Sequence, residues 1–121
     1  MNERGRLGRA GEQEALEYLE GLGMRLMVRN WRWGRKELDL VMESEDALHI
    51  VEVKTLNLPS PIEPWEQVDR KKRSNLIKAA AGFVSQRHIR KEVQFDIVSI
   101  KVFGDAQEIR YIPNAFYPIM I

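Results

Sequence analysis

The chain has 121 residues, 44% of them hydrophobic, and a net charge of +1, so we expect one globular domain, residues 1–121, with a core of its own. It contains no cysteine, which excludes disulfides, thiolate zinc sites and thiol catalysis and suits a reducing compartment such as the cytoplasm. Its polar and basic N-terminus is unlike a secretory signal, and no apolar run approaches the roughly 20 residues that span a membrane, so no membrane partner is expected.

The first half of the chain predicts one helix followed by three strands. A helix is predicted over residues 9–22, where the apolar stripe is Ala15, Tyr18, Leu19 and Leu22. Runs that alternate or are rich in β-branched residues predict strands at residues 24–33, 36–42 and 47–55. Gly34 marks the first turn between strands, and residues 44–47 suit a four-residue hairpin loop at the second.

The second half predicts another helix and two further strands. A proline-rich loop, residues 58–64, precedes a helix predicted over residues 65–87, and strands are predicted at residues 93–102 and 108–112. The apolar tail, residues 113–121, is expected to pack on the domain or on a partner, which a second copy of the chain would supply in a homodimer. Helices on the faces of a sheet that contains a hairpin predict an α/β fold with a mixed sheet.

Two carboxylates and a lysine stand inside the apolar strands. They form the pattern D-x12-E-V-K, with Asp39 in the second strand and Glu52 and Lys54 in the third. An unpaired charge in an apolar setting costs several kcal/mol, as much as a domain's margin of stability. If the hairpin loop is residues 44–47, Asp39 lies directly opposite Glu52, with Cβ atoms about 5 Å apart. Magnesium prefers such oxygen ligands, and Lys54 on the same face could orient a water or stabilise negative charge.

Each predicted helix also carries one charge on its apolar stripe. Glu12 falls on the face of Leu16, and Lys72 falls on the face of Leu76. Two helices that cover a sheet and each aim one charge inward indicate a shared polar site. The residues predicted to meet there are Glu12, Asp39, Glu52, Lys54 and Lys72.

Acids and bases are separated along the chain. Residues 37–69 contain nine acids and one base, whereas residues 70–91 contain eight bases and no acid. This order suits a metal-dependent nuclease, in which acids bind the metal and bases bind phosphates, although charge alone favours a solvated helix face. The bases predicted to bind nucleic acid are Arg70, Lys71, Arg73 and Lys78.

Several short motifs occur in order over residues 8–102: Gly11-Glu12, Asn30-Trp31-Arg32, Glu37-Leu38-Asp39-Leu40, Val51-Glu52-Val53-Lys54-Thr55, Val68 with Lys72 and Leu76, and Phe95-Asp96-Ile97-Val98. As a set they resemble the YraN-type family of predicted endonucleases. That family belongs to the PD-(D/E)xK superfamily and is similar to Holliday-junction resolvases.

The resemblance implies a restriction-endonuclease-like fold, with three layers α/β/α and a central mixed sheet. It also implies a magnesium or manganese site that acts on DNA, including branched or damaged DNA. Asp39 and Glu52 would bind the metal and take part in catalysis, and Glu12 would complete the acidic site. Lys54 would be the catalytic lysine, and Lys72 would reach the site from the second helix.

The chain departs from the family pattern at three positions. Lys36 stands where the family usually has glycine, and Leu56 and Gln94 stand where basic residues are usual. None of the three is a presumed metal ligand. The loss of two basic positions would weaken the binding of phosphate.

Several of these residues also fit a structural role, and the chain also fits a protein without catalytic activity. Lys54 could form only an ion pair with Glu37 or Asp39. The chain could be a catalytically silent nucleic-acid-binding module with a nuclease fold, or an adaptor that uses its apolar tail as an interface. His49 is expected to face away from Glu52 as a core or surface histidine. Asp96 either approaches the site or has a structural hydrogen-bonding role. Packing is favoured over base stacking for Trp31, Trp33 and Trp65.

Overall fold

The computed structural model describes residues 3–118 of the chain. Its helices and strands follow in the predicted order, with one short 3-10 helix in addition. No helix within residues 3–118 is long and apolar enough to cross a membrane. The elements are α1 (Glu3–Gly21), β1 (Arg25–Trp33), β2 (Lys36–Glu43), β3 (Ala47–Asn57), the 3-10 helix η1 (Pro64–Gln67), α2 (Arg70–Arg87), β4 (Glu92–Phe103) and β5 (Ala106–Phe116).

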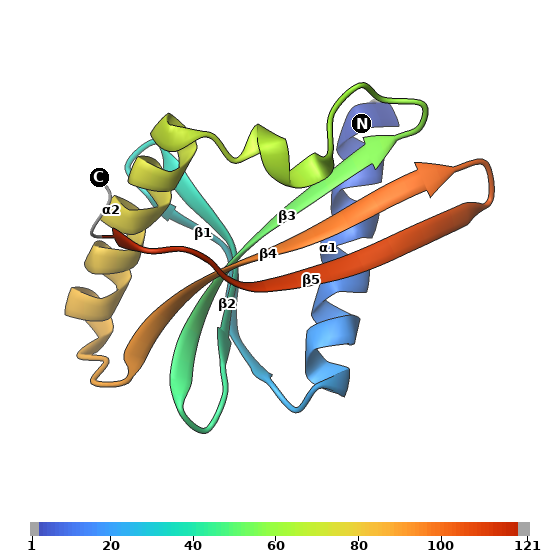
Figure 1. Ribbon diagram of the computed structural model, residues 1–121. Helices are drawn as coiled ribbons and strands as arrows, with labels where there is room; N and C mark the ends of the chain where they lie inside the picture. Colours follow the sequence, from blue (N-terminus) through green and yellow to red (C-terminus); the bar gives the residue numbers. More distant parts are fainter. Residues whose placement is uncertain (1–2, 119–121) are drawn as a thin grey trace.

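The strands form one mixed sheet between two helices. They lie in the order β1-β2-β3-β4-β5, and only β3 and β4 are parallel, because the crossover between them contains α2. The other neighbouring pairs are antiparallel. Figure 1 shows α1 behind the sheet and α2 in front of it. The predicted α/β/α layering with a central mixed sheet is therefore confirmed.

Alternate residues of the strands pack against different helices. Ile50 of β3 belongs to a core with Phe83 of α2, whereas its neighbour Val51 belongs to a second core with Leu19 of α1. This separation follows from the period of two along a strand. A charge that shares the face of Ile50, as Glu52 does, must therefore lie on the α2 side of the sheet.

The hairpin of β2 and β3 has the predicted register. Glu43 pairs with Leu48, and the ladder runs from there to Leu40 opposite Val51. Beyond this pair, within residues 3–118, β2 continues along β1 only, and β3 continues along β4 only. The sheet is thus split at one end of the hairpin, and Asp39 is the first residue of β2 inside the split.

The second helix begins later than the sequence predicts. Residues 64–67 form η1, whose first position is a proline, and α2 starts only at Arg70. Asp69 is the N-cap of α2, since its carboxylate accepts a hydrogen bond from the backbone N–H of Lys72 at 2.9 Å. The predicted start at residue 65 was wrong because these local capping contacts interrupt the helical pattern, although Val68 between the two helices is still buried.

The buried stripe of α1 differs from the predicted one. Ala15, Leu16 and Leu19 are buried, but Tyr18 and Leu22 are among the exposed large residues. Tyr18 lies at the edge of the interface, where its ring meets Tyr111 of β5 edge-on at 6.4 Å between centroids. The stripe is rotated because α1 packs mainly on β3, and the face toward that strand begins at Gly11, Ala15 and Leu16.

The described part of the C-terminal tail packs on the domain itself. The fifth strand extends to Phe116, well past the predicted end at residue 112. The Phe116 ring stacks on Phe95 with 5.1 Å between centroids and is buried in the core on the α2 side. The last three residues of the predicted tail, 119–121, lie outside the described residues.

Gly82 in α2 provides space for a tryptophan ring. A Cβ built on Gly82 would lie 2.6 Å from ring atoms of Trp33, whereas one on Gly21 of α1 would meet nothing within 4 Å. We expect Gly82→Ala to lower the free energy of unfolding by about 1 kcal/mol, because overpacking outweighs the gain in helix propensity. Urea denaturation measures this change. Gly21→Ala is the matched control and is expected to have no effect or to stabilise, and an equal gain in both variants would contradict the prediction.

Candidate metal-binding and catalytic site

The split in the sheet brings Asp39 and Glu52 together. Asp39 is half-buried, and one of its oxygens accepts a hydrogen bond from the backbone N–H of Val53 at 3.0 Å, where the next ladder contact of β2 and β3 would stand. Glu52 is 1% exposed. Burial and the neighbouring Asp39 carboxylate raise the pKa of Glu52 to about 8, against the opposing effect of two lysines. The two predicted metal ligands are therefore neighbours in a site of low solvent access.

Both predicted lysines lie beside Glu52. The Nζ of Lys72, from α2, is 3.3 Å from Oε2 of Glu52, and the Nζ of Lys54, from β3, is 3.5 Å from the same oxygen. The pairing of Lys54 with Glu37 that the hairpin register suggested is not formed, since Glu37 pairs instead with Arg32 of β1 at 3.4 Å. The other carboxylate oxygen, Oε1 of Glu52, is buried and has no hydrogen-bond partner among residues 3–118.

Glu12 approaches the site from α1 on the side of Asp39. It is half-buried, and burial followed by the charge of Asp39 raises its pKa above the ordinary value. Asn30 of β1 joins Glu12 to Glu37: with its amide nitrogen turned toward these two acids, it donates at 3.0 Å and 3.2 Å respectively. The structure thus places Glu12 next to Asp39, while the two lysines lie next to Glu52.

Asn30 is a site residue that reasoning on charge and hydrophobic period did not single out. Its φ is 53°, in the left-handed region, which is unusual for a residue in a strand and is tolerated best by asparagine and glycine. This backbone turn directs the Asn30 amide to the acids. The usable signal was an asparagine between Arg29 and Trp31 inside a predicted strand.

The site fits a magnesium-type ion better than a softer metal. Within residues 3–118, no three His, Asp or Glu side chains converge closely enough to hold a metal ion together. Magnesium is commonly bound by one or two carboxylates and keeps several waters, so the pair of Asp39 and Glu52 meets its needs. The unpartnered Oε1 of Glu52 supplies a free ligand atom, and the Val53 N–H fixes the Asp39 carboxylate in place.

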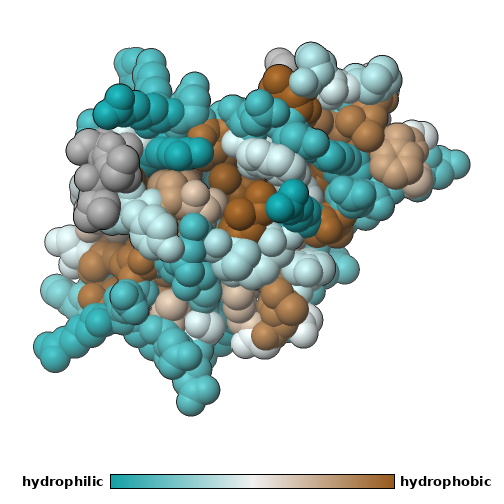
Figure 2. All heavy atoms as spheres, in the orientation of Figure 1, coloured by the Kyte–Doolittle hydropathy of each residue, from teal (hydrophilic) through white to brown (hydrophobic). Residues whose placement is uncertain are grey.

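The four predicted phosphate-binding bases do not form one patch. Lys71 and Lys78 are exposed and share one stripe of α2, since they are seven residues apart. Arg73 is half-buried: its Nε donates to the Val68 carbonyl at 2.9 Å, and its guanidinium lies 5.3 Å from the centre of the Phe116 ring. Figure 2 shows hydrophilic side chains over the N-terminal end of α2, where three of the four bases begin the helix.

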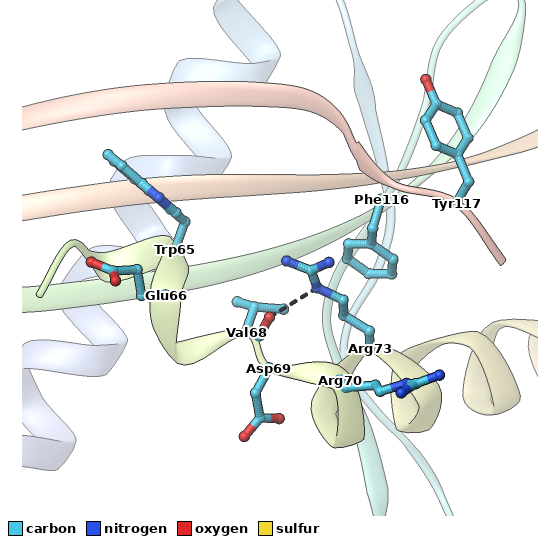
Figure 3. Close-up of a pocket in the computed structure, with 8 residues that line it drawn as sticks. All are labelled: Trp65, Glu66, Val68, Asp69, Arg70, Arg73, Phe116 and Tyr117. Atoms are coloured by element: carbon cyan, nitrogen blue, oxygen red, sulfur yellow. Dashed lines mark hydrogen bonds between the residues drawn. The ribbon is translucent and has the colours of Figure 1, made fainter. Parts of the chain in front are cut away.

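Arg73 and the exposed Arg70 line an open groove beside the start of α2. Figure 3 shows Arg73 reaching between Val68 and Phe116, with Trp65 on one side and Tyr117 on the other. The groove has a volume of about 670 Å³ and contains none of the acids of the split. These two arginines are therefore placed apart from Glu52, while Lys72 of the same helix reaches it.

Asp96 is not part of the candidate site. It lies on the α1 side of the sheet, level with Val51, and is fully buried. Burial raises the pKa of Asp96, but hydrogen bonds from four groups together lower it by more than burial raises it. The pKa of Asp96 therefore lies below its ordinary value. The donors are His49 Nδ1 at 2.8 Å, Tyr111 Oη at 2.6 Å, Gln94 Nε2 at 2.9 Å and the Asn114 N–H at 3.0 Å. Its role is structural.

His49 is a core histidine, as predicted. It is 5% exposed and joins Asp96 to Ser44, whose Oγ lies 2.8 Å from its Nε2. The chain Ser44–His49–Asp96 has the connectivity of a hydrolytic triad. However, the Ser44 hydroxyl also accepts a hydrogen bond from the Ala47 N–H at 3.2 Å and so closes the hairpin loop. The network ties the loop between β2 and β3 to the core.

Trp31 and Trp65 have packing roles, as predicted, and Trp33 contacts Trp31. Trp31 meets Phe83 edge-on at 5.2 Å between centroids, and Trp33 stacks on Trp31 at 5.8 Å. Trp65 lies under the guanidinium of Arg110, 4.9 Å from its ring centre. Of the three, Trp33 is the most exposed, at 43%.

Comparison with known proteins identifies the family. Residues 11–100, which include all five residues of the predicted site, match the model described as "Uncharacterised protein family UPF0102". The chain belongs to family UPF0102. This is the YraN-type family that the motifs resemble.

Relatives in family UPF0102 match along nearly their whole length. A UPF0102 protein of Bacteroides thetaiotaomicron is 40% identical over 118 residues, covering 98% of each chain. One of Ectopseudomonas mendocina is 40% identical over 118 residues, covering 96% of this chain and 98% of its own. One of Flavobacterium johnsoniae is 36% identical over 121 residues, covering 97% and 98%. These UPF0102 relatives share the fold-forming span and carry no specific activity in their names.

The raised pKa of Glu52 predicts how the stability of this UPF0102 protein depends on pH. Between the ordinary pKa of 4.5 and about 8, the folded protein holds a proton that the unfolded chain has lost. The free energy of unfolding should therefore be highest below pH 4.5 with respect to this group and fall as the pH rises to 8, by at most about 1.4 kcal/mol per pH unit. Urea denaturation in EDTA over this range measures the slope.

The control for this slope is Glu52→Gln, which cannot titrate. Its free energy of unfolding should increase relative to that of the wild type as the pH rises. Parallel pH profiles for the two proteins would mean that Glu52 is already ionised in the metal-free fold.

Proposed function

We propose that the protein is a magnesium- or manganese-dependent endonuclease that hydrolyses phosphodiester bonds in DNA, including branched or damaged DNA. One observation carries this proposal. Glu52 is almost fully buried beside Asp39, and one of its carboxylate oxygens has no hydrogen-bond partner in the described part of the chain. Two lysines lie within 3.5 Å of its other oxygen. A buried acid in this state costs stability, and a divalent cation would remove that cost.

Asp39 and Glu52 would hold the ion, which would supply Lewis-acid stabilisation of the charge on the phosphate when bound. The protein's own residues provide the remaining functions. The hydrogen bond from Val53 N–H keeps the Asp39 carboxylate directed into the split. Lys54, half-buried on the same strand as Glu52, is positioned to hold the attacking water or to stabilise negative charge on a phosphate oxygen.

Lys72 supplies a second positive charge from the opposite layer. Its ammonium lies 3.3 Å from Glu52 and is half-buried, so it reduces the electrostatic repulsion between the two acids. Glu12 has a raised pKa next to Asp39 and is suited to exchange a proton at the edge of the site. The exposed bases of α2 would bind the phosphates of the DNA on either side of the cut.

A cleavage assay tests this function directly. The substrates are linear, nicked and four-way-junction DNA, each incubated with magnesium, with manganese and with EDTA. Cleavage of at least one substrate that needs the metal and is blocked by EDTA is the expected result. Isothermal titration with manganese, without DNA, provides a second measurement that does not depend on substrate choice. No cleavage and no metal binding together would reject the proposal.

A non-catalytic nucleic-acid-binding module is the second candidate. It is favoured by one observation: both lysines already lie against Oε2 of Glu52, and no third acid within residues 3–118 converges with Asp39 and Glu52 closely enough to hold a metal ion. In such a module the charges would form a closed structural network. Salt-sensitive DNA binding that is unchanged in Asp39→Asn, with no manganese bound in titration, would support the module over the enzyme.

A further inference from the structure

The β1–β2 hairpin presents a tryptophan ring to solvent. Trp33 is 43% exposed although it stacks on Trp31 and lies over Gly82 of α2. A glycine in the middle of a helix costs about 1 kcal/mol relative to alanine, and here it makes room for the Trp33 ring. The ring is therefore held in a fixed orientation by its neighbours while a large part of its surface stays open.

Positive charge lies near this ring. Residues 29–36 contain four bases and no acid. Arg35, in the turn, is exposed, and neither Arg35 nor Lys36 forms an ion pair with any residue from 3 to 118. Lys78 is exposed one helical turn before Gly82, so it lies on the same stripe of α2 as Gly82. The nearest acid on β2, Glu37, is engaged by Arg32.

We propose that Trp33 is a stacking platform for an unpaired base of the DNA substrate, and that Arg35, Lys36 and Lys78 bind the phosphates that flank this base. Stacking of a base on an aromatic side chain contributes about 1–3 kcal/mol. Bases inside a duplex are already stacked on each other, so an exposed platform selects nucleotides that lack a partner. The substrate class is therefore DNA with a single-stranded segment, such as a flap, a gap or a branch point.

The hairpin is close enough to the split for one strand of DNA to reach both. Lys36 is three residues before Asp39 on β2, roughly 10 Å along the strand. That distance corresponds to about three stacked nucleotides at about 3.4 Å each. The inference rests on the proposed nuclease function for the role of the split, where the same strand would be cut. Binding to the hairpin surface itself can be measured without any cleavage.

Binding of single-stranded oligonucleotides in EDTA tests this platform. The probes are fluorescein-labelled oligothymidylate and an abasic oligomer of the same length, which carries the same phosphates but no bases, and the readout is fluorescence anisotropy. We expect the wild type to bind oligothymidylate roughly 10-fold more tightly than the abasic oligomer. Trp33→Leu should lose this preference and keep its affinity for the abasic oligomer. Trp33→Phe, which retains an aromatic ring, should keep most of the preference for oligothymidylate.

Phe103→Leu is the matched control. Phe103 is also an exposed aromatic residue at the end of a strand, 46% exposed. It ends β4, on the opposite side of the molecule from α2 (Figure 1). This variant should keep the full preference for bases. Arg35→Ala should weaken the binding of both probes equally. It should also reduce the slope of log affinity against log salt concentration by about 1.

Two outcomes would overturn the inference. Equal affinity of the wild type for oligothymidylate and the abasic oligomer excludes a stacking platform, whatever the variants do. A base preference that persists in Trp33→Leu places the platform elsewhere. Because EDTA removes the metal, neither result depends on catalysis. Base-selective binding by a protein that shows neither cleavage nor metal binding would reject the proposed function and retain the platform.

Discussion

Glu52→Gln is expected to lower metal-dependent DNA cleavage by about 10³-fold or more. Glutamine has nearly the same shape but offers only one oxygen, and it cannot take up the negative charge that Glu52 would carry beside Asp39, Lys54 and Lys72 once a metal displaces its proton. Manganese affinity should fall in parallel, since the variant keeps one of the two carboxylates of the pair. Single-turnover cleavage and isothermal titration at the same pH measure the two effects.

The fold is expected to survive this substitution. The folded protein already holds Glu52 protonated to about pH 8 in the absence of metal, so a neutral amide replaces a largely neutral acid near pH 7. Glu92→Gln, at an exposed position at the start of β4, is the control for the loss of one negative charge. Full cleavage by Glu52→Gln would show that the nuclease site lies elsewhere.

Asp96→Asn is expected to lower the free energy of unfolding by about 3 kcal/mol. One oxygen of Asp96 accepts from His49 and Tyr111, and the other accepts from Gln94 and the backbone of Asn114. Whichever way the new amide is turned, its NH2 group, itself a donor, faces two other hydrogen-bond donors. Loss of these bonds should also loosen the hairpin loop, because His49 connects Asp96 to it.

Urea denaturation above pH 5 measures this loss. Folding lowers the pKa of Asp96, so the ionised form stabilises the protein above the ordinary pKa of 3.8, and this contribution disappears as the pH falls through the lowered pKa. The difference in free energy of unfolding between wild type and variant should therefore become smaller at acidic pH. Asp105→Asn, in the exposed turn between β4 and β5, is the matched control. A variant as stable as the wild type would mean that the network rearranges freely around an amide.

Much of the candidate site could be predicted from local chain geometry. The loop of residues 44–47 fixed the register of the hairpin, and the observed pairing of Glu43 with Leu48 agrees with it. The period of two then put Asp39 and Glu52 on one face. The helical period likewise put Lys72 on the side of α2 that faces the sheet, where it meets Glu52.

Other features depend on how whole elements dock. The sequence could not distinguish whether Asp96 approaches the site, because that depends on the register of β4 against β3, which are joined only through a long crossover. The same is true of Arg73, which lies on the basic stretch of the sequence but packs on Phe116, forty-three residues later in the chain. Asn30 required knowledge of its left-handed backbone, which no periodicity reveals.

The sequence by itself determined the order of the elements, the two faces of the sheet and the pair Asp39–Glu52. These follow from short-range rules, since strand period, turn length and helical period act within a few residues. The tertiary structure alone decided that both lysines lie against one oxygen of Glu52, that Glu12 lies beside Asp39, and that the ladder between β2 and β3 ends at the acids. These features come from the packing of two helices on a twisted sheet, where contacts between distant residues set each position.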